Sequence, residues 1–140
     1  MDGNAPLPFE LLDHPGDLKL SARGASLEEL FANAARGMMA FLFGDEVAEL
    51  RAERALAVEI EAPDRGALLV DWLSELLFRA TSEYSAYVDI RVHKVSERRL
   101  RATVGAVSVE AINDIKAVTH HELSLERRNA GWEATIVFDI

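Results

Sequence analysis

The sequence contains no cysteine, and this absence excludes several classes of protein at the outset. Without a thiol the chain can form no disulfide, no thiolate metal site and no cysteine nucleophile. The composition is compatible with the cytoplasm, where we expect the protein to act. No apolar run approaches the roughly 18–20 residues that a membrane span needs, so we expect no membrane partner. The first residues carry no basic side chain, and we expect no secretory signal there.

Basic residues are scarce relative to acidic ones. The chain has 15 Lys and Arg against 24 Asp and Glu, which gives a formal net charge of −9. Such a chain repels phosphate backbones, so we expect no direct nucleic-acid binding. The acid excess suits a basic protein partner or a metal ion, and it equally suits solubility alone. The sequence also lacks a Walker-type loop, a dinucleotide fingerprint, a nucleophile elbow and an HExxH motif, which disfavours a self-contained enzyme.

The 140 residues, of which 49% are hydrophobic, are enough for one domain with a substantial core. We expect a loose N-terminus over residues 1–8 and a single domain over residues 9–140. Helical periodicity predicts helices at about 27–42 and 66–81. Alternation of apolar and polar residues predicts strands at 17–23, 54–62, 88–92, 100–104, 115–126 and 132–138.

This order of elements, β-α-β-α-β-β-β-β, predicts an α+β fold. Short turns between the last strands favour antiparallel pairing. We expect a two-layer sandwich, with a largely antiparallel sheet of about six strands and both amphipathic helices on one of its faces. Ser26 and Glu29 form a capping box before the first helix, Asp64 is an expected N-cap of the second, and Gly44 is a plausible stop between them.

Carboxylates stand at the two ends of the predicted domain. Asp17 opens a strand directly after the Pro15-Gly16 break, Asp139 closes the last strand, and Ile140 adds the terminal carboxylate. Hard divalent cations bind several oxygen ligands, and strand ends can supply them with little strain. If the fold brings these ends together, the sequence predicts a cation site. Two solvated strand ends fit the same pattern.

The histidines are the other candidates for chemistry. His120 and His121 are adjacent, and neighbours on a strand point to opposite faces, so they cannot easily bind one ion together. His121 is in register with apolar residues and is expected to be buried or half-buried. His120 shares a face with Lys116 and is the better functional candidate. Asp13 and His14 can form an acid–base pair or a hydrogen bond that anchors a loop.

Five short segments together form a pattern that is more specific than any one of them. They are FELLDH at 9–14 followed by Asp17, SLEELFANAA at 26–35, LLVDWLSELLF at 68–78, IKAVTHH at 115–121 and VFDI at 137–140. In this order they resemble the archease family, over nearly the whole chain. The sequence departs from the family pattern at Pro15-Gly16, where Thr-Ala is usual, and at His120, where Tyr is usual.

The resemblance implies a small α+β protein that assists the RtcB-type RNA ligase of tRNA splicing and RNA repair. It implies that the protein promotes guanylylation and multiple turnover of this ligase and is not itself an enzyme. Matched residue by residue, the metal-binding positions of the family correspond to Asp17, Asp139 and Ile140. The implied cofactor is a divalent cation: Ca²⁺, Mg²⁺ or Mn²⁺.

Four further residues are candidates for partner contact or for support of this site. They are Asp13, His14, Lys116 and His120. Two other functions stay open at this point. One is a stand-alone metal-dependent hydrolase that uses His14 or His120 as its base. The other is a chaperone-like binding module in which the metal is purely structural.

Overall fold

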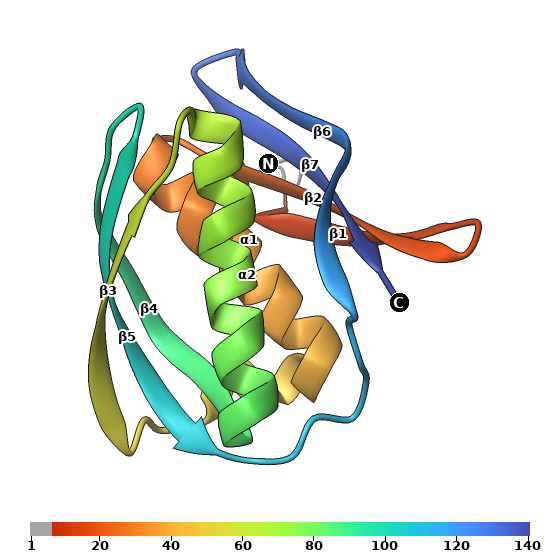
Figure 1. The fold of residues 1–140 in the computed structure, drawn as a ribbon, viewed down its shortest axis with the longest axis vertical. Helices are drawn as coiled ribbons and strands as arrows, with labels where there is room; N and C mark the ends of the chain where they lie inside the picture. The colour runs from red at the N-terminus through yellow and green to blue at the C-terminus, as the bar shows by residue number, and fades with distance from the viewer. Residues whose placement is uncertain (1–6) are drawn as a thin grey trace, which may run out of the picture.

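The computed structural model describes residues 7–140 and consists of two antiparallel sheets with two helices between them (Figure 1). The four-stranded sheet has the order β1-β2-β7-β6, and the three-stranded sheet has the order β3-β5-β4. The strands of the first sheet are Phe9–His14 (β1), Asp17–Gly24 (β2), Gly131–Asp139 (β7) and Ala117–Arg128 (β6). Those of the second are Arg54–Glu61 (β3), Arg99–Ser108 (β5) and Ser85–Val95 (β4).

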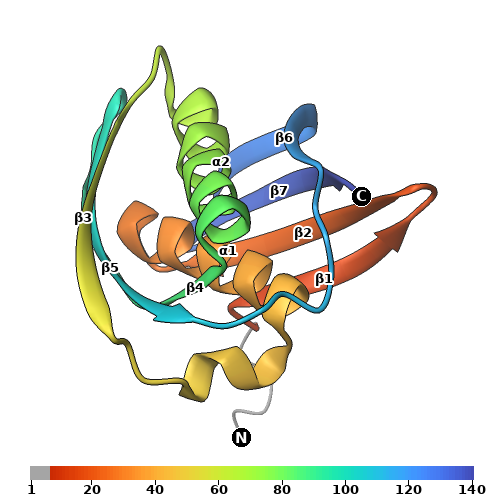
Figure 2. The ribbon, with the colours of Figure 1, turned by 60° about the horizontal axis from the view of Figure 1, so that its bottom comes forward.

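The predicted α+β class and the antiparallel pairing are confirmed, whereas the single sheet is wrong. Within residues 7–140 the strands number seven and divide into two sheets, so the layers run sheet, helices, sheet (Figure 2). The seventh strand is β1, which is not among the six ranges that alternation predicted. The expected loose N-terminus, residues 1–8, lies mostly outside the part of the chain that the structure describes.

The first helix explains why a single sheet is not enough. Helix α1, Leu27–Phe43, packs against β1 and β2 on one side and against β4 on the other. Its apolar stripe is buried as predicted, but so are the small residues around it, including Ala32, Ala35 and Ala40. A helix that buries apolar residues on more than one side needs a covering layer on each of those sides. The second sheet provides that cover.

The helix ends follow the predicted local chemistry closely. Ser26 Oγ accepts the N–H of Glu29 at 3.1 Å, while the Glu29 carboxylate accepts the N–H of Ala25 instead of the expected Ser26. Asp64 caps helix α2, Arg65–Glu83, by accepting the N–H of Ala67 at 2.8 Å. These caps satisfy backbone donors that the first turn of a helix leaves unpaired.

The connector after α1 forms a short 3-10 helix, η1, over Asp45–Glu49, and Gly44 ends α1 with a φ of +93°. The two long helices meet at Trp72, which is fully buried and donates its indole N–H to the carbonyl of Phe31 at 2.9 Å. Within residues 7–140 no helix is long and apolar enough to span a membrane.

Candidate functional site

Three strand ends meet at one end of the four-stranded sheet and bring the two termini of the domain together. Asp17, the first residue of β2, is the direct partner of Asp139, the last residue of β7. Asp139 is also the partner of Ala117 in β6, and its carbonyl accepts the N–H of Lys116 at 2.7 Å. The end of β7 lies beside the β1–β2 hairpin in both ribbon views (Figures 1 and 2). We call the site formed by Asp17, Asp139 and Ile140 the strand-end site.

The Pro15-Gly16 break is the tight turn of the hairpin that carries Asp17. His14 and Asp17 are cross-strand partners, so only these two residues form the loop. Proline fixes its own φ near −65°, and Gly16 has a φ of +75°. This combination matches the φ values of a type II turn, which favours glycine at its second central position. Pro15-Gly16, which departs from the Thr-Ala of the family pattern, therefore forms a tight two-residue turn directly before Asp17.

The two carboxylates of the strand-end site lie on the outer face of the sheet. Along β2 the core-facing residues are Leu18 and Leu20, so Asp17 points the other way. Direct partners in an antiparallel pair have Cβ atoms about 4.5–5.5 Å apart and share a face, so Asp139 projects beside Asp17. Asp17 is half-buried, whereas Asp139 and Ile140 are exposed. The site is therefore open to another molecule.

The ligand atoms that the strand-end site offers are carboxylate oxygens, the type that hard cations prefer. Two carboxylates in register supply oxygen ligands, and their like charges favour a cation between them. Across residues 7–140, no three His, Cys, Asp or Glu side chains gather in a way that could hold a metal ion. A third protein ligand would therefore come from the carboxylate of Ile140. Oxygen donors without Cys favour Ca²⁺, Mg²⁺ or Mn²⁺ over zinc.

A wide bulge in β6 changes the interpretation of the two histidines. Thr119 pairs with Val137 and Ser124 pairs with Thr135, so four residues of β6 lie opposite a single residue of β7. Within this bulge His121 is exposed, and its Nε2 lies 3.2 Å from the carboxylate of Glu122. The prediction that His121 is buried or half-buried is wrong, because alternation does not continue through a bulge.

The candidate supporting residues lie around the site at different positions. Asp13 pairs with Leu18 and is exposed, so it lies on the opposite face of the hairpin from Asp17. Lys116 joins the site through its main-chain bond to Asp139, and its side chain is exposed. His120 is exposed within the bulge, and His14 is the cross-strand partner of Asp17.

Sequence reasoning missed two neighbours of the strand-end site. Lys19 Nζ lies 3.3 Å from Glu122 Oε1, which joins β2 to the bulge of β6 on the outer face. The position of Lys19 could have been found, because alternation places it on the same face as Asp17. Glu122 has a φ of +55°, and its place depends on a bulge for which the sequence gives no local signal.

Taken together, the fold and the site define a class of small α+β proteins whose second and last strands pair so that an Asp from each lies in register. The sequence pattern of the Archease protein family (MTH1598/TM1083) matches residues 9–140. The chain therefore belongs to the archease family, as the resemblance predicted.

Curated relatives and solved structures agree with this assignment. The chain is 35% identical to "Protein archease" of Methanosarcina acetivorans over 141 residues, which cover 94% of this chain and 95% of that protein. It is 32% identical to "Protein archease" of Methanothermobacter thermautotrophicus, with 94% and 98% covered. The solution structure of Methanobacterium thermoautotrophicum protein 1598 matches with a TM-score of 0.70 and 29% identity over 95% of this chain and 99% of that one. A crystal structure from Thermotoga maritima, described as an archease and possible chaperone, shares the fold with a TM-score of 0.62 at 22% identity, covering 92% of this chain and 94% of that one.

Proposed function

We propose that the protein is a non-catalytic activator of an RtcB-type RNA ligase and promotes the guanylylation and multiple turnover of that enzyme. In this proposal Asp17, Asp139 and the carboxylate of Ile140 bind a divalent cation at the surface that meets the ligase. The observation that supports it is the register of β2 and β7, which makes Asp17 and Asp139 direct partners. The partner in this proposal is the one that the resemblance to the archease family implies.

The exposure of the site suits an accessory role. A cation held by two or three carboxylates keeps open coordination positions, and Mg²⁺ in particular binds one or two carboxylates together with phosphates of a substrate. Asp139 and Ile140 are exposed, so a second protein can approach them directly. The cation supplies positive charge for phosphate groups at the joint surface. The protein contributes a rigid strand pair that holds the carboxylates in place.

The acidic character of the chain fits such a partner. A formal net charge of −9 complements an enzyme that binds RNA through a basic surface. Electrostatic complementarity of this kind mainly accelerates association and selects partners. Lys116 and His120, which are both exposed near the strand-end site, are candidates for direct contact with the ligase.

Single-turnover guanylylation of the ligase, measured without RNA, tests the proposal. We expect Asp17→Asn and Asp139→Asn to abolish most of the stimulation, whereas Asp71→Asn, which alters an exposed carboxylate on α2, should stimulate like the wild type. Loss of a direct ligand should lower cation affinity by at least the roughly 10–100-fold seen when residues behind the ligands are altered. Calorimetric titration of the isolated protein with Ca²⁺ or Mn²⁺ measures this directly. Wild-type stimulation by both variants would exclude the strand-end site from the mechanism.

A chaperone-like binding module is the alternative that a specific observation favours. Phe78, Tyr84 and Ile112 expose 68%, 69% and 69% of their surface, and the T. maritima relative in fold is described as a possible chaperone. A short extension after Ile140 separates the two functions. It should damage a cation site that uses the Ile140 carboxylate, and it should leave binding through a distant apolar surface intact. A stand-alone hydrolase would instead show metal-dependent turnover by the isolated protein.

A further inference from the structure

Basic side chains gather on the β4–β5 hairpin, although the chain as a whole is acidic. Residues 91–101 contain five of the 15 Lys and Arg residues and one acidic residue, Glu97. The expectation of no nucleic-acid binding follows from the net charge, which averages over the whole chain. A phosphate group near the surface responds mainly to charges within a Debye length, about 10 Å at moderate salt. The hairpin is thus a basic surface on an acidic protein.

A β-bulge places two of these cations side by side. Val92 pairs with Ala102, and Lys94 pairs with Arg101, so His93 is the extra residue of β4. The bulge reverses the alternation and turns Lys94 to the outer face of the sheet, beside Arg101. Like charges directly opposite each other on a sheet are destabilising by about 0.2–1 kcal/mol. The hairpin therefore holds an unfavourable pair that a bound anion would stabilise.

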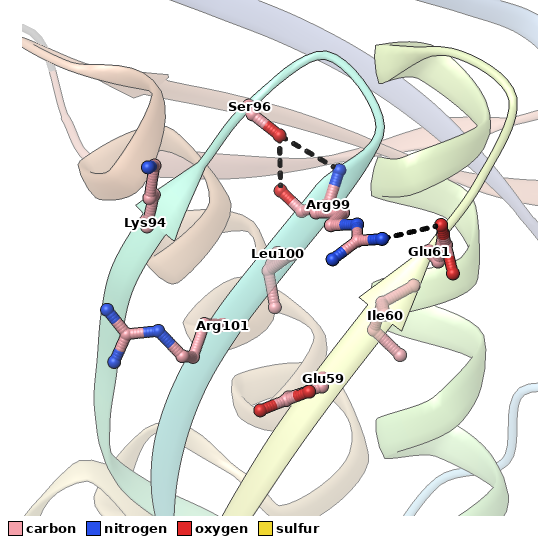
Figure 3. Close-up of a pocket in the computed structure, with 8 residues that line it drawn as sticks. All are labelled: Glu59, Ile60, Glu61, Lys94, Ser96, Arg99, Leu100 and Arg101. Atoms are coloured by element: carbon pink, nitrogen blue, oxygen red, sulfur yellow. Dashed lines mark hydrogen bonds and ion pairs between the residues drawn. The ribbon is translucent and has the colours of Figure 1, made fainter.

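Nearby carboxylates neutralise only part of this charge. Arg99 Nη2 lies 3.4 Å from Glu61 Oε2, and their side chains are 77% and 71% exposed, so solvent screens this pair strongly. Glu59 is the cross-strand partner of Arg101. In Figure 3 the guanidinium of Arg101 nevertheless extends over β4, away from Glu59. Within residues 7–140 the carboxylates of β3 thus form an ion pair with Arg99 and with neither Lys94 nor Arg101.

Within residues 7–140, three cations of the hairpin make no ion pair, and all three are exposed: Lys94, Arg98 and Arg101. Lys94, Arg99 and Arg101 line a pocket of about 480 Å³ together with Glu59 and Glu61, so three cations face two carboxylates there (Figure 3). Arg99 and Arg101 share the outward face of β5, and in Figure 3 the guanidinium of Arg99 extends towards Glu61 whereas that of Arg101 extends over β4. No aromatic side chain lines this pocket. It therefore suits phosphate groups and not stacked bases.

We propose that the outer face of the β4–β5 hairpin binds the phosphodiester backbone of RNA, through Lys94, Arg98, Arg99 and Arg101 and without sequence preference. The surface is on the three-stranded sheet, and the strand-end site is on the four-stranded sheet (Figure 1). The protein can therefore contact the ligase with one sheet and RNA with the other. The choice of RNA as the polyanion rests on the proposed function, since an RNA ligase brings RNA to the complex.

Fluorescence anisotropy with the isolated protein and a labelled RNA of about 20 nucleotides tests the proposal. We expect saturable binding at about 50 mM salt, with log K falling linearly as log[salt] rises, by about 0.7 for each phosphate contact. The matched variants are Arg101→Glu and Arg51→Glu. Both alter an exposed arginine that makes no ion pair within residues 7–140, and both change the net charge equally.

Arg101→Glu and Lys94→Glu should each weaken RNA binding about tenfold at this salt concentration and reduce the salt slope by about 1. Arg51→Glu should stay within about twofold of the wild type, since one distant charge is largely screened. If a reversal impairs folding, Arg101→Gln and Lys94→Gln should still reduce the slope. No saturable binding by the wild type, or equal losses in Arg51→Glu and Arg101→Glu, would overturn the proposal.

A third outcome would also overturn it. If Arg101→Glu leaves RNA affinity unchanged but weakens binding to the ligase in the absence of RNA, the hairpin contacts an acidic protein surface instead. The two proposals fail separately. RNA binding is measured with the isolated protein, while guanylylation is measured without RNA.

Discussion

The turn before Asp17 offers a direct test of how the strand-end site is held in place. Gly16 has a φ of +75°, and a Cβ atom added there would meet nothing within 4 Å. Replacing Gly16 by Ala therefore changes backbone strain and creates no steric clash. For a residue with an L side chain the left-handed region costs about 1–2 kcal/mol. Alanine also lowers the conformational entropy of the unfolded chain, which stabilises the folded state by about 0.4–1 kcal/mol.

The difference ranges from about 0 to 1.6 kcal/mol, and its midpoint is a net destabilisation of roughly 0.8 kcal/mol for Gly16→Ala. In a domain of this size that corresponds to a decrease of about 2–4 °C in the midpoint of thermal unfolding. Urea unfolding followed by circular dichroism measures the free energy, and the slope against urea should not change. Gly16→Asn is the control, since asparagine tolerates the left-handed region better and should lose clearly less stability. Equal stability of Gly16→Ala and the wild type, or equal losses in both variants, would refute the assignment of strain to this turn.

Two further predictions concern the core. Trp72→Phe should lower the free energy of unfolding by roughly 2–3 kcal/mol, since it removes the 2.9 Å hydrogen bond to the Phe31 carbonyl and leaves a void beside α1. Urea unfolding measures this free energy. A loss below about 0.5 kcal/mol would contradict the close packing of Trp72 against α1. Burial, followed by the charge of Glu83, raises the pKa of Tyr87 to about 12. Its neutral form therefore stabilises the fold below pH 10, and this contribution is lost as the pH rises from 10 towards 12. Ultraviolet titration should show part of the tyrosinate signal appearing only near pH 12, and Tyr87→Phe should remove that part.

The local parts of the fold could be predicted from the sequence because they depend on residues close together in the chain. Ser26 and Asp64 cap their helices through bonds to backbone groups three residues away, as expected. The pair between Glu75 and Arg79, four residues apart on α2, forms at 2.7 Å. The strand ranges follow from alternation, apart from β1 and the ends.

The division into two sheets could not be predicted in the same way. Alternation shows which residues face a core, and it does not show which strand pairs with which. The β2–β7 and β3–β5 pairings join segments far apart in the chain, and helix α1 must lie between them. The bulges at His93 and around His120 were equally invisible, because they interrupt the pattern that a sequence reading relies on.

The register of β2 and β7 places Asp17 beside Asp139 in the strand-end site, and burial of apolar side chains in the core fixes that register. The pairs Leu18–Phe138 and Leu20–Ile136 are in the same ladder as Asp17–Asp139, and all four apolar side chains are buried. If the register slipped by one residue, the buried side chains of one strand would turn to solvent, and each exposed side chain would cost about 1.5–3 kcal/mol of folding free energy.

Repulsion between two facing carboxylates is smaller, about 0.2–1 kcal/mol. Burial therefore outweighs repulsion, and the strands keep Asp17 and Asp139 side by side without a cation. In the proposed role, a cation at this site would find its ligands already placed, so little of its binding free energy would be needed to order the chain. Burial in the core of the four-stranded sheet thus fixes the positions of Asp17 and Asp139 on its opposite face, where the proposed cation would bind.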